Sequence, residues 1–255
     1  MPKSMQWGSF EIRGPRHELR EEVMLRTLLA HCHPERLNLF LEAGCGSASF
    51  SIKLLERFPN LKGVGFDRGA GFGRIVDGKT RGKAYGFSVH EGGFDDIPSE
   101  VSDKKYDLII CGEVLEHLED DRSAVKKMHD LLNRGGYLLA SVPHRRDYWT
   151  VEDELSSHFR RYEVDDAKGL MTAAGFRTVS SIVWGFPATK LYAKQVYGRM
   201  ISSGHEAQYR DGLPQRLVSR AIFSLLRLDL LFLGDMRGIG LVLLCQKKSE
   251  GEAAP

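Results

Sequence analysis

The chain has 255 residues, of which 42% are hydrophobic and 27% are charged. Its 36 Lys and Arg residues almost balance its 34 Asp and Glu residues, so the formal net charge is only +2. This length and composition are typical of one ordinary globular domain with room for an insertion. The balanced charge argues against nucleic acid as the bulk partner, because such binding normally requires a strongly basic surface.

The four cysteines lie in or beside apolar runs, without C-x-x-C spacing, at Cys32, Cys45, Cys111 and Cys245. This usage predicts a reduced, cytoplasmic chain with neither a disulfide framework nor a zinc knuckle. The N-terminal segment has no apolar stretch of signal-peptide length, and the most apolar segment, residues 225–233, is interrupted by Arg227 and Asp229. We therefore expect neither secretion nor a membrane span.

Helical periodicity and apolar runs alternate along the chain. A leading helix is expected at residues 16–31, where apolar residues recur at helical spacing before Pro34. Apolar runs then predict five strands, which end at Glu42, Asp67, Glu91, Gly112 and Val142. Helices are predicted at residues 52–58 and 120–132. Strands that alternate with helices in this way indicate a mostly parallel sheet with both faces covered.

The second half predicts a helix at 163–175, a sixth strand at 176–184 and a final strand at 238–248. The segment between these two strands predicts two helices, at 188–201 and 214–233. The fold class is therefore α/β, with a doubly wound sheet. The chain is expected to divide into an N-terminal helical lead, a core, a helical insertion, the final core strand and a disordered tail, at residues 1–35, 36–185, 186–236, 237–248 and 249–255.

A glycine-rich turn follows the first strand. Gly44 and Gly46 allow the backbone to approach a ligand, and the next helix presents its N-terminus to an anion. A dinucleotide loop, G-x-G-x-x-G, would have its third glycine at Ser49 and would bring Glu42 beside a pyrophosphate, where like charges repel. A ligand with both an ammonium and a carboxylate, such as a methionyl group, fits this arrangement better.

The second strand ends in Asp67, at the carboxyl edge where open α/β sheets bind ligands. A carboxylate there is able to accept two hydrogen bonds from a ribose diol. Together with the glycine turn and Glu42, this acid predicts a ligand that contains adenosine.

Several motifs occur in order along the chain: FLEAGCGSASF, GVGFD, YDLIICGEVLEHL, LNRGGYLLASVP and AAGF. Together they resemble the class I S-adenosylmethionine-dependent methyltransferases, from Leu37 to Phe176, and most closely the branch with ubiquinone-biosynthesis and other small-molecule enzymes. The resemblance implies a Rossmann-like, seven-stranded, mostly parallel sheet with an antiparallel last strand. It also implies S-adenosyl-L-methionine as the cofactor.

By this resemblance, the cofactor would contact residues at the ends of four strands: Glu42, Gly44, Cys45, Gly46, Asp67, Arg68, Gly93, Phe94, Cys111 and Gly112. The first four would line the methionyl part, Asp67 would bind the ribose, and the last two would pass close to the methionyl amino group.

Two positions depart from the family pattern. Ala48 stands where a third glycine is usual, and Gly93 stands where an acid usually meets the adenine amino group. Phe94 is expected to cover the adenine, and Asp95 or Asp96 to replace the missing acid.

Three histidines are expected at the carboxyl edge of the sheet: His117, His144 and His158. Methyl transfer from a sulfonium needs orientation, desolvation and, for a hydroxyl acceptor, a general base. Histidine is the usual base near neutral pH, so these three are the catalytic candidates.

Glu113, Glu116 and His117 form an E-x-x-E-H motif, which on a helix would place the three side chains on one face. Such a set is able to hold a divalent cation. Some members of the resembled family are metal-dependent through this motif, including enzymes that methylate small RNAs at a terminal ribose and some ubiquinone O-methyltransferases, but others carry it without a metal. We expect no metal, with a metal-assisted site of these three residues and His158 as the alternative.

The loop after the fifth strand is rich in aromatic and basic residues. Tyr148 and Trp149 are expected either to cover the acceptor or to pack at the edge of the fold. The arginines of this loop are expected either to bind an anionic acceptor or to be solvated; they are Arg145, Arg146, Arg160 and Arg161.

The predicted helix at 214–233 has a narrow polar stripe, and apolar residues cover most of its remaining surface. Its apolar face is expected to pack on the domain, on a second copy, over a lipid-like acceptor, or on a membrane surface with arginines at the headgroups. Phe223 and Leu230 are expected among its outward residues. The stripe consists of Arg216, Arg220, Ser224 and Arg227.

The expected activity is S-adenosylmethionine-dependent O-methylation of a small-molecule, sugar or lipid-linked acceptor, with a histidine base. The alternatives are metal-assisted O-methylation, a non-catalytic module that binds an adenosine ligand and, with less support, a nicotinamide-dependent dehydrogenase. A homodimer and peripheral membrane contact through residues 214–233 are the further expectations about partners.

Overall fold

A computed structural model of the protein describes residues 14–83, 85–197 and 213–248. Its centre is a seven-stranded sheet in the order β3-β2-β1-β4-β5-β7-β6. The strands are β1 (Leu39–Ala43), β2 (Lys62–Asp67), β3 (Phe87–Glu91), β4 (Tyr106–Gly112), β5 (Leu132–Pro143), β6 (Phe176–Trp184) and β7 (Gly240–Lys247). β7 lies antiparallel to both β5 and β6, and the other pairs are parallel. The predicted fold class is confirmed.

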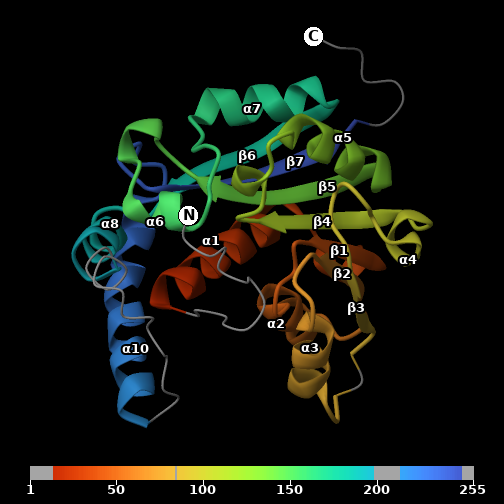
Figure 1. Ribbon diagram of the computed structural model, residues 1–255, viewed down its shortest axis with the longest axis horizontal. Helices are drawn as coiled ribbons and strands as arrows, with labels where there is room; N and C mark the ends of the chain where they lie inside the picture. The colour runs from red at the N-terminus through yellow and green to blue at the C-terminus, as the bar shows by residue number, and fades with distance from the viewer. Residues whose placement is uncertain (1–13, 84, 198–212, 249–255) are drawn as a thin grey trace, which may run out of the picture.

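Helices cover both faces of the sheet (Figure 1). The helices are α1 (Pro15–His31), α2 (Ser49–Arg57), α3 (Phe72–Thr80), α4 (Ser99–Ser102), α5 (Asp121–Leu131), α6 (Val151–Leu155), α7 (Val164–Ala173), α8 (Ala188–Tyr192) and α10 (Leu213–Leu226). In Figure 1, α5 and α7 lie above the sheet, and α1, α2 and α3 lie below it. The central strands are almost continuously hydrophobic because helices cover the sheet on both sides.

The core is divided by the sheet into two clusters of buried side chains. One cluster joins the sheet to α5 and α7 and includes Met128 and Met171. The other joins it to α1, α2 and α10 and includes Leu19, Leu54 and Leu226. All four cysteines are buried and free, and none of the described helices is both long and apolar enough to cross a membrane.

Strand register brings the motif residues to one edge. Glu42 of β1 is in register with Gly65 of β2 on one side and Ile110 of β4 on the other. Asp67 and Gly112 each lie two residues farther along their strands, so three strand ends meet at one place. From β1 the chain continues to β2 and β3 on one side of the sheet, and it then returns to β4 on the other side of β1. Open α/β sheets bind ligands at the point where the strand order reverses in this way.

The insertion differs from its prediction in two ways. The predicted helix at 188–201 is α8 followed by a π-helical turn, Ala193–Tyr197, and its last residues lie outside the described part of the chain, as does the tail at 249–255. The predicted helix at 214–233 changes at Leu226 into a 3-10 segment, Arg227–Phe232. The buried Asp229 within that segment accepts hydrogen bonds from two backbone N–H groups of α8, which ties the two parts of the insertion together.

Candidate active site

The glycine loop between β1 and α2 is held by Asp67. One carboxylate oxygen accepts from the backbone N–H of Gly46 at 2.8 Å, and the other accepts from that of Gly69 at 2.8 Å. Gly44 has a φ of +70° and a Cβ there would lie 2.4 Å from a methyl carbon of Val114, so this position requires glycine. Ala48, in place of the usual third glycine, adopts a φ of +56° as the N-cap of α2. Asp67 therefore shapes the loop, and its carboxylate oxygens keep further lone pairs able to accept from a ligand hydroxyl.

Glu42 is 8% exposed at the end of β1, and its carboxyl group accepts from the hydroxyl of Ser51 in the first turn of α2. Burial raises the pKa of Glu42 to about 8, although the Ser51 hydrogen bond opposes the change. A cationic ligand group would favour the charged form, so this carboxyl group is suited to an ammonium.

A cavity of about 410 Å³ adjoins the ends of β2 and β4, and Arg68, Phe94, Asp95 and His117 are among its lining residues. Phe94 packs edge-to-face on Phe66, with ring centroids 5.4 Å apart. A Cβ at Gly93 would lie 2.3 Å from Nε of Arg68, so Gly93 makes room for this arginine, which pairs with Asp95. Two predicted adenine-side residues, Phe94 and Asp95, thus line one cavity together with Arg68, and Asp96 is not in its lining.

The two cysteines of the predicted set contribute differently. Cys111 is fully buried and Cys45 is 6% exposed, and Cys111 belongs to the core cluster on the α5 side. A ligand at the strand ends would therefore meet Cys111 through its backbone, as it would at the neighbouring Gly112.

His117 and His158 come together on a 3-10 turn and a loop that are distant in sequence. Their rings lie 4.6 Å apart in an edge-to-face arrangement. The backbone N–H of Phe159 donates to the carbonyl of Glu116 at 2.8 Å, which ties the two segments to each other. One ligand atom from each of Glu116, His117 and His158 lies within 4.8 Å of the others.

Glu116 is fully buried, and neither of its carboxylate oxygens has a hydrogen-bond partner among the described residues. Burial, together with the charge of Glu113, raises the pKa of Glu116 well above its usual range. Burial and the neighbouring His158 lower the pKa of His117 to about 4, so its imidazole is neutral at pH 7. Within the described part of the chain, the two oxygens of Glu116 are thus the atoms of this cluster that are buried without a hydrogen-bond partner.

Asp153 orients His158. Its fully buried carboxylate accepts from Nδ1 of His158 at 2.8 Å and from the Arg161 guanidinium at 2.8 and 2.9 Å. Burial acts to raise the pKa of Asp153, but the hydrogen bonds from His158 and Arg161 outweigh it and hold the pKa well below its usual range. Because this carboxylate is an acceptor, Nδ1 carries the proton and Nε2 of His158 keeps a free lone pair.

The structure corrects the helical placement of the E-x-x-E-H motif. Only Leu115–His117 forms a turn, and Glu113 precedes it with a φ of +56°. The Glu113 carboxylate instead accepts from the Ser141 hydroxyl at 3.0 Å and lies 3.8 Å from Arg20. The chain must leave the end of β4 before α5 begins, which prevents a helix at the motif.

His144 is not brought to the other two histidines. It is fully buried, its Nδ1 lies 2.9 Å from the carbonyl of Tyr162, and its carbonyl accepts from Arg161. These contacts join the end of β5 to the following loop, and His144 does not line the cavity that contains His117.

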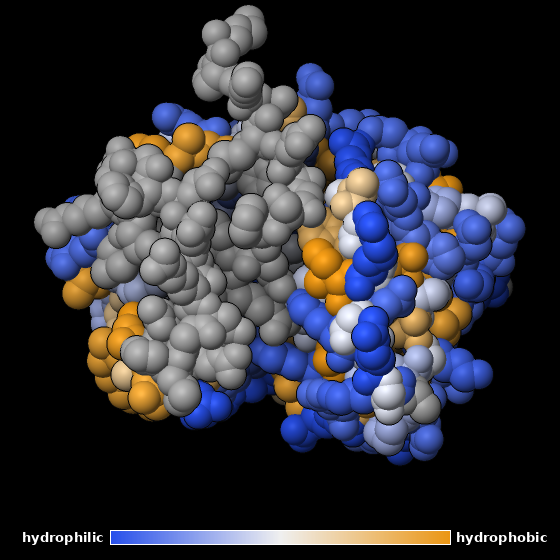
Figure 2. Space-filling view, turned by 60° about the horizontal axis from the view of Figure 1, so that its bottom comes forward, coloured by the Kyte–Doolittle hydropathy of each residue, from blue (hydrophilic) through white to orange (hydrophobic). Residues whose placement is uncertain are grey.

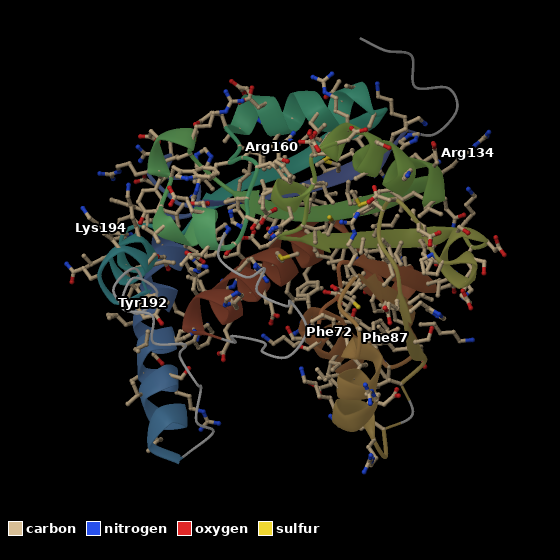
Figure 3. All side chains as sticks on the ribbon, in the orientation of Figure 1. Phe72, Phe87, Arg134, Arg160, Tyr192 and Lys194 are labelled. Atoms are coloured by element: carbon tan, nitrogen blue, oxygen red, sulfur yellow. The ribbon has the colours of Figure 1, made fainter. Side chains whose placement is uncertain are left out.

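Most of the aromatic and basic loop residues lie at the edge of the fold. Tyr148 has cationic groups of Arg161 and Lys190 over its ring, at 5.3 and 5.2 Å. Arg160 lies on the α7 side of the sheet (Figure 3), where it pairs with Asp121 at 3.0 Å. Arg145 pairs with Asp147 and Arg146 with Asp166, and Trp149 is 42% exposed.

A second cavity, here called the arginine cavity, lies between α1 and the ends of β5 and β6. It is lined by Arg16, His17, Arg20, Glu113, Pro143, Glu152, His158, Arg161, Trp184, Ile239 and Gly240. The sequence did not single out Arg16, Arg20 and Trp184. No local motif marks them, although the i, i+4 spacing of the two arginines places them on one face of α1.

Comparison with known proteins identifies the family of the chain and its fold. A family model described as "Methyltransferase domain" matches residues 16–181. The chain belongs to this family. Residues 16–181 are therefore a methyltransferase domain, and S-adenosyl-L-methionine is its cofactor.

The methyltransferase aligns with only part of each of its curated relatives. It is 28% identical over 131 residues to malonyl-[acyl-carrier protein] O-methyltransferase 1 of Ilyobacter polytropus, covering 51% of this chain and 47% of that protein. It is 28% identical over 109 residues to ubiquinone biosynthesis O-methyltransferase of Ralstonia nicotianae, covering 41% and 43%. The chain thus spans about half the length of these relatives.

The fold of the methyltransferase matches solved structures. The N-methyltransferase NodS from Bradyrhizobium japonicum, in complex with S-adenosyl-L-homocysteine, superposes with a TM-score of 0.59 at 16% identity, covering 93% of this chain and 90% of that one. This similarity covers more of the chain than the family match does, and it concerns the fold alone.

Proposed function

We propose that the protein methylates an oxygen of a small-molecule, sugar or lipid-linked acceptor, with His158 as the general base. The observation that supports this proposal most strongly is the hydrogen bond from Nδ1 of His158 to the buried Asp153, which leaves Nε2 of His158 free. The two curated relatives described above are O-methyltransferases, which supports oxygen as the acceptor atom. The family match favours methyl transfer over a binding module or a dehydrogenase.

When bound, S-adenosylmethionine would supply a methyl group from its sulfonium, and the sulfur atom would keep the electron pair of the broken methyl–sulfur bond. Nε2 of His158 takes the proton of the acceptor hydroxyl as its oxygen bonds to the methyl carbon. Asp153 holds the ring in the required tautomer and stabilises the imidazolium that forms. Arg161, with two hydrogen bonds, keeps Asp153 in place.

The test is transfer of labelled methyl from S-adenosylmethionine to a panel of hydroxyl acceptors. His158→Gln is expected to lower kcat by about 10²-fold or more, with unchanged S-adenosylhomocysteine affinity. His33→Gln is the matched control, because His33 is exposed and pairs with the neighbouring Glu35, far from the cluster in sequence. Unchanged kcat in His158→Gln would exclude this residue as the base.

The second candidate is metal-assisted O-methylation. The convergence of Glu116, His117 and His158, with a buried carboxylate that has no partner among the described residues, favours it. Two imidazoles and a carboxylate suit a divalent first-row metal, and Asp153 would orient the His158 ligand from behind. A cation there would lower the pKa of an acceptor hydroxyl bound to it.

Chelation separates the two mechanisms. With His158 as a simple base, turnover survives EDTA; with a metal, turnover is lost and returns with one divalent ion. Calorimetric titration with Mn²⁺ or Mg²⁺ gives a readout independent of activity, and Glu116→Gln is expected to abolish binding if the cluster holds the ion.

A further inference from the structure

Two of the three arginines in the arginine cavity are held by carboxylates. Arg16 is bound by both oxygens of Glu152, one at 2.8 Å. Arg161 is bound by both oxygens of Asp153, at 2.8 and 2.9 Å. These pairs hold two of the arginines in the lining of the cavity in place.

Arg20 differs from both. Its Nε is buried without a hydrogen-bond partner among the described residues, and its ion pair with Glu113 spans 3.8 Å. Its guanidinium therefore retains donors that no carboxylate of the described chain satisfies at hydrogen-bond distance.

Trp184 supplies a second such donor in the same cavity. It is 4% exposed, and its indole Nε1 is buried without a partner among the described residues. A Cβ at Gly240, which also lines the cavity, would lie 2.4 Å from this Nε1, so glycine makes room for the indole. Indole and guanidinium N–H groups are donors only, and buried donors in native proteins normally have an acceptor.

We propose that the arginine cavity binds an anionic group of the methyl acceptor, a carboxylate or a phosphate, with Arg20 as the specificity-determining residue and Trp184 as a second donor. An oxyanion in this cavity would offer an acceptor to these donors, and its charge complements the loosely paired guanidinium. His158 lines the same cavity, so an acceptor anchored at Arg20 has its remaining atoms near this histidine. The inference rests on the proposed function and adds to it the charge of the acceptor.

Binding of simple probes tests the proposal without turnover. In calorimetric titrations of protein saturated with S-adenosylhomocysteine, 4-hydroxybenzoate is expected to bind about tenfold or more tightly than 4-hydroxybenzamide. Arg20→Gln should remove this preference, Arg20→Lys should keep part of it, and Trp184→Phe should weaken it severalfold. Inorganic phosphate, titrated in parallel, shows whether the site prefers phosphate to carboxylate.

Arg26→Gln is the matched control, because Arg26 lies on the same helix but is exposed and paired with Glu22. Equal binding of acid and amide, an Arg20→Gln variant that keeps the preference, or no binding of either anion up to ~10 mM would overturn the proposal. Methyl transfer at equal rates to charged and uncharged acceptors would overturn it as well, while leaving the proposed function intact. Arg20-dependent anion binding without methyl transfer to any acceptor would contradict the proposed function alone.

Discussion

Glu42 and Asp153 are both buried carboxyl groups, but their surroundings shift their pKa values in opposite directions. Burial dominates at Glu42, where Ser51 is the side-chain donor, and the pKa rises to about 8. At Asp153 a histidine and a bidentate arginine donate to the carboxylate, and the pKa is held low. A cationic ligand would therefore favour ionisation of Glu42, whereas Asp153 is charged without a ligand and orients His158.

Replacement of Glu42 tests the first role. If Glu42 faces the methionyl ammonium, binding requires its carboxylate, so wild-type affinity for S-adenosylhomocysteine should rise between pH 6 and pH 8 with proton release. Glu42→Gln should bind about 10- to 100-fold more weakly, since a hydrogen bond to a charged group contributes about 1.5–3 kcal/mol, and should lose most of this pH dependence. Calorimetry in buffers of different ionisation enthalpy measures both effects. A pH-independent wild-type affinity would place the ammonium elsewhere.

Replacement of Asp153 tests the second role. Asp153→Asn should lower kcat about 10²-fold and change the pH–rate profile, because an amide no longer selects the Nδ1–H tautomer of His158. Thr150→Ala is the control: it removes one 2.9 Å hydrogen bond to Asp153 without touching His158 and should keep nearly wild-type kcat. A profile identical to wild type in a folded Asp153→Asn protein would show that His158 needs no orientation.

At the scale of elements, α10 and the following turn present two different apolar surfaces. Leu226 is 1% exposed, and Phe223 and Leu230 pack against the core cluster below the sheet, so the expectation that these two face outward is wrong. The outward residues are Leu217, Val218, Leu225, Leu228 and Leu231. Figure 2 shows apolar side chains gathered at the end of the molecule where Figure 1 places α10. Domain packing therefore accounts for only one face of this helix.

We expect the outward face to contact membranes that carry anionic lipid. The double variant Leu217→Ser, Leu231→Ser should keep the thermal unfolding midpoint within a few degrees, because both side chains are more than half exposed. It should sediment less with phosphatidylglycerol vesicles than wild type. Leu226→Ser, the buried control, should lose about 2–5 kcal/mol of stability. Unchanged vesicle binding would exclude the membrane, and a change in sedimentation mass instead would indicate a second copy of the chain.

For the whole molecule, buried carboxyl groups make stability depend on pH in both directions. Glu42 and Glu116 have raised pKa values, so the folded state binds more protons than the unfolded chain above the ordinary value of 4.5, and stability falls as pH rises toward 8. Asp153 has a lowered pKa, so its contribution is present above the ordinary value of 3.8 and is lost as pH falls below it. Stability should therefore be greatest in mildly acidic solution.

The variant Glu116→Gln tests how the raised pKa of this buried carboxyl group makes stability depend on pH. In EDTA at pH 8 the variant should be more stable than wild type by about 1–3 kcal/mol, because it removes a buried carboxyl group whose raised pKa disfavours the folded state as the pH increases. At pH 5, where Glu116 is protonated in the folded state, the difference should nearly disappear. Urea unfolding at the two pH values measures it. An equal difference at both would show that Glu116 does not titrate in this range.

The local patterns of the sequence are sufficient for the elements and for the cofactor edge. Apolar runs mark all seven strands, and parallel strands end at one edge, so the sequence alone places Glu42, Asp67 and Gly112 together. The glycine loop is equally readable, since its backbone conformation depends mainly on adjacent residues. These features follow from periodicity and chain direction.

The acceptor side is decided only by tertiary structure. Arg20 on the first helix, Arg161 in a loop and Trp184 at a strand end share one cavity, although no spacing in the sequence relates them. Likewise, Glu116 separates from Glu113 and joins His158 because the chain turns at the end of β4 instead of continuing as a helix. Such convergence depends on how helices and loops pack over the sheet, and packing is determined by contacts between distant segments that periodicity does not encode.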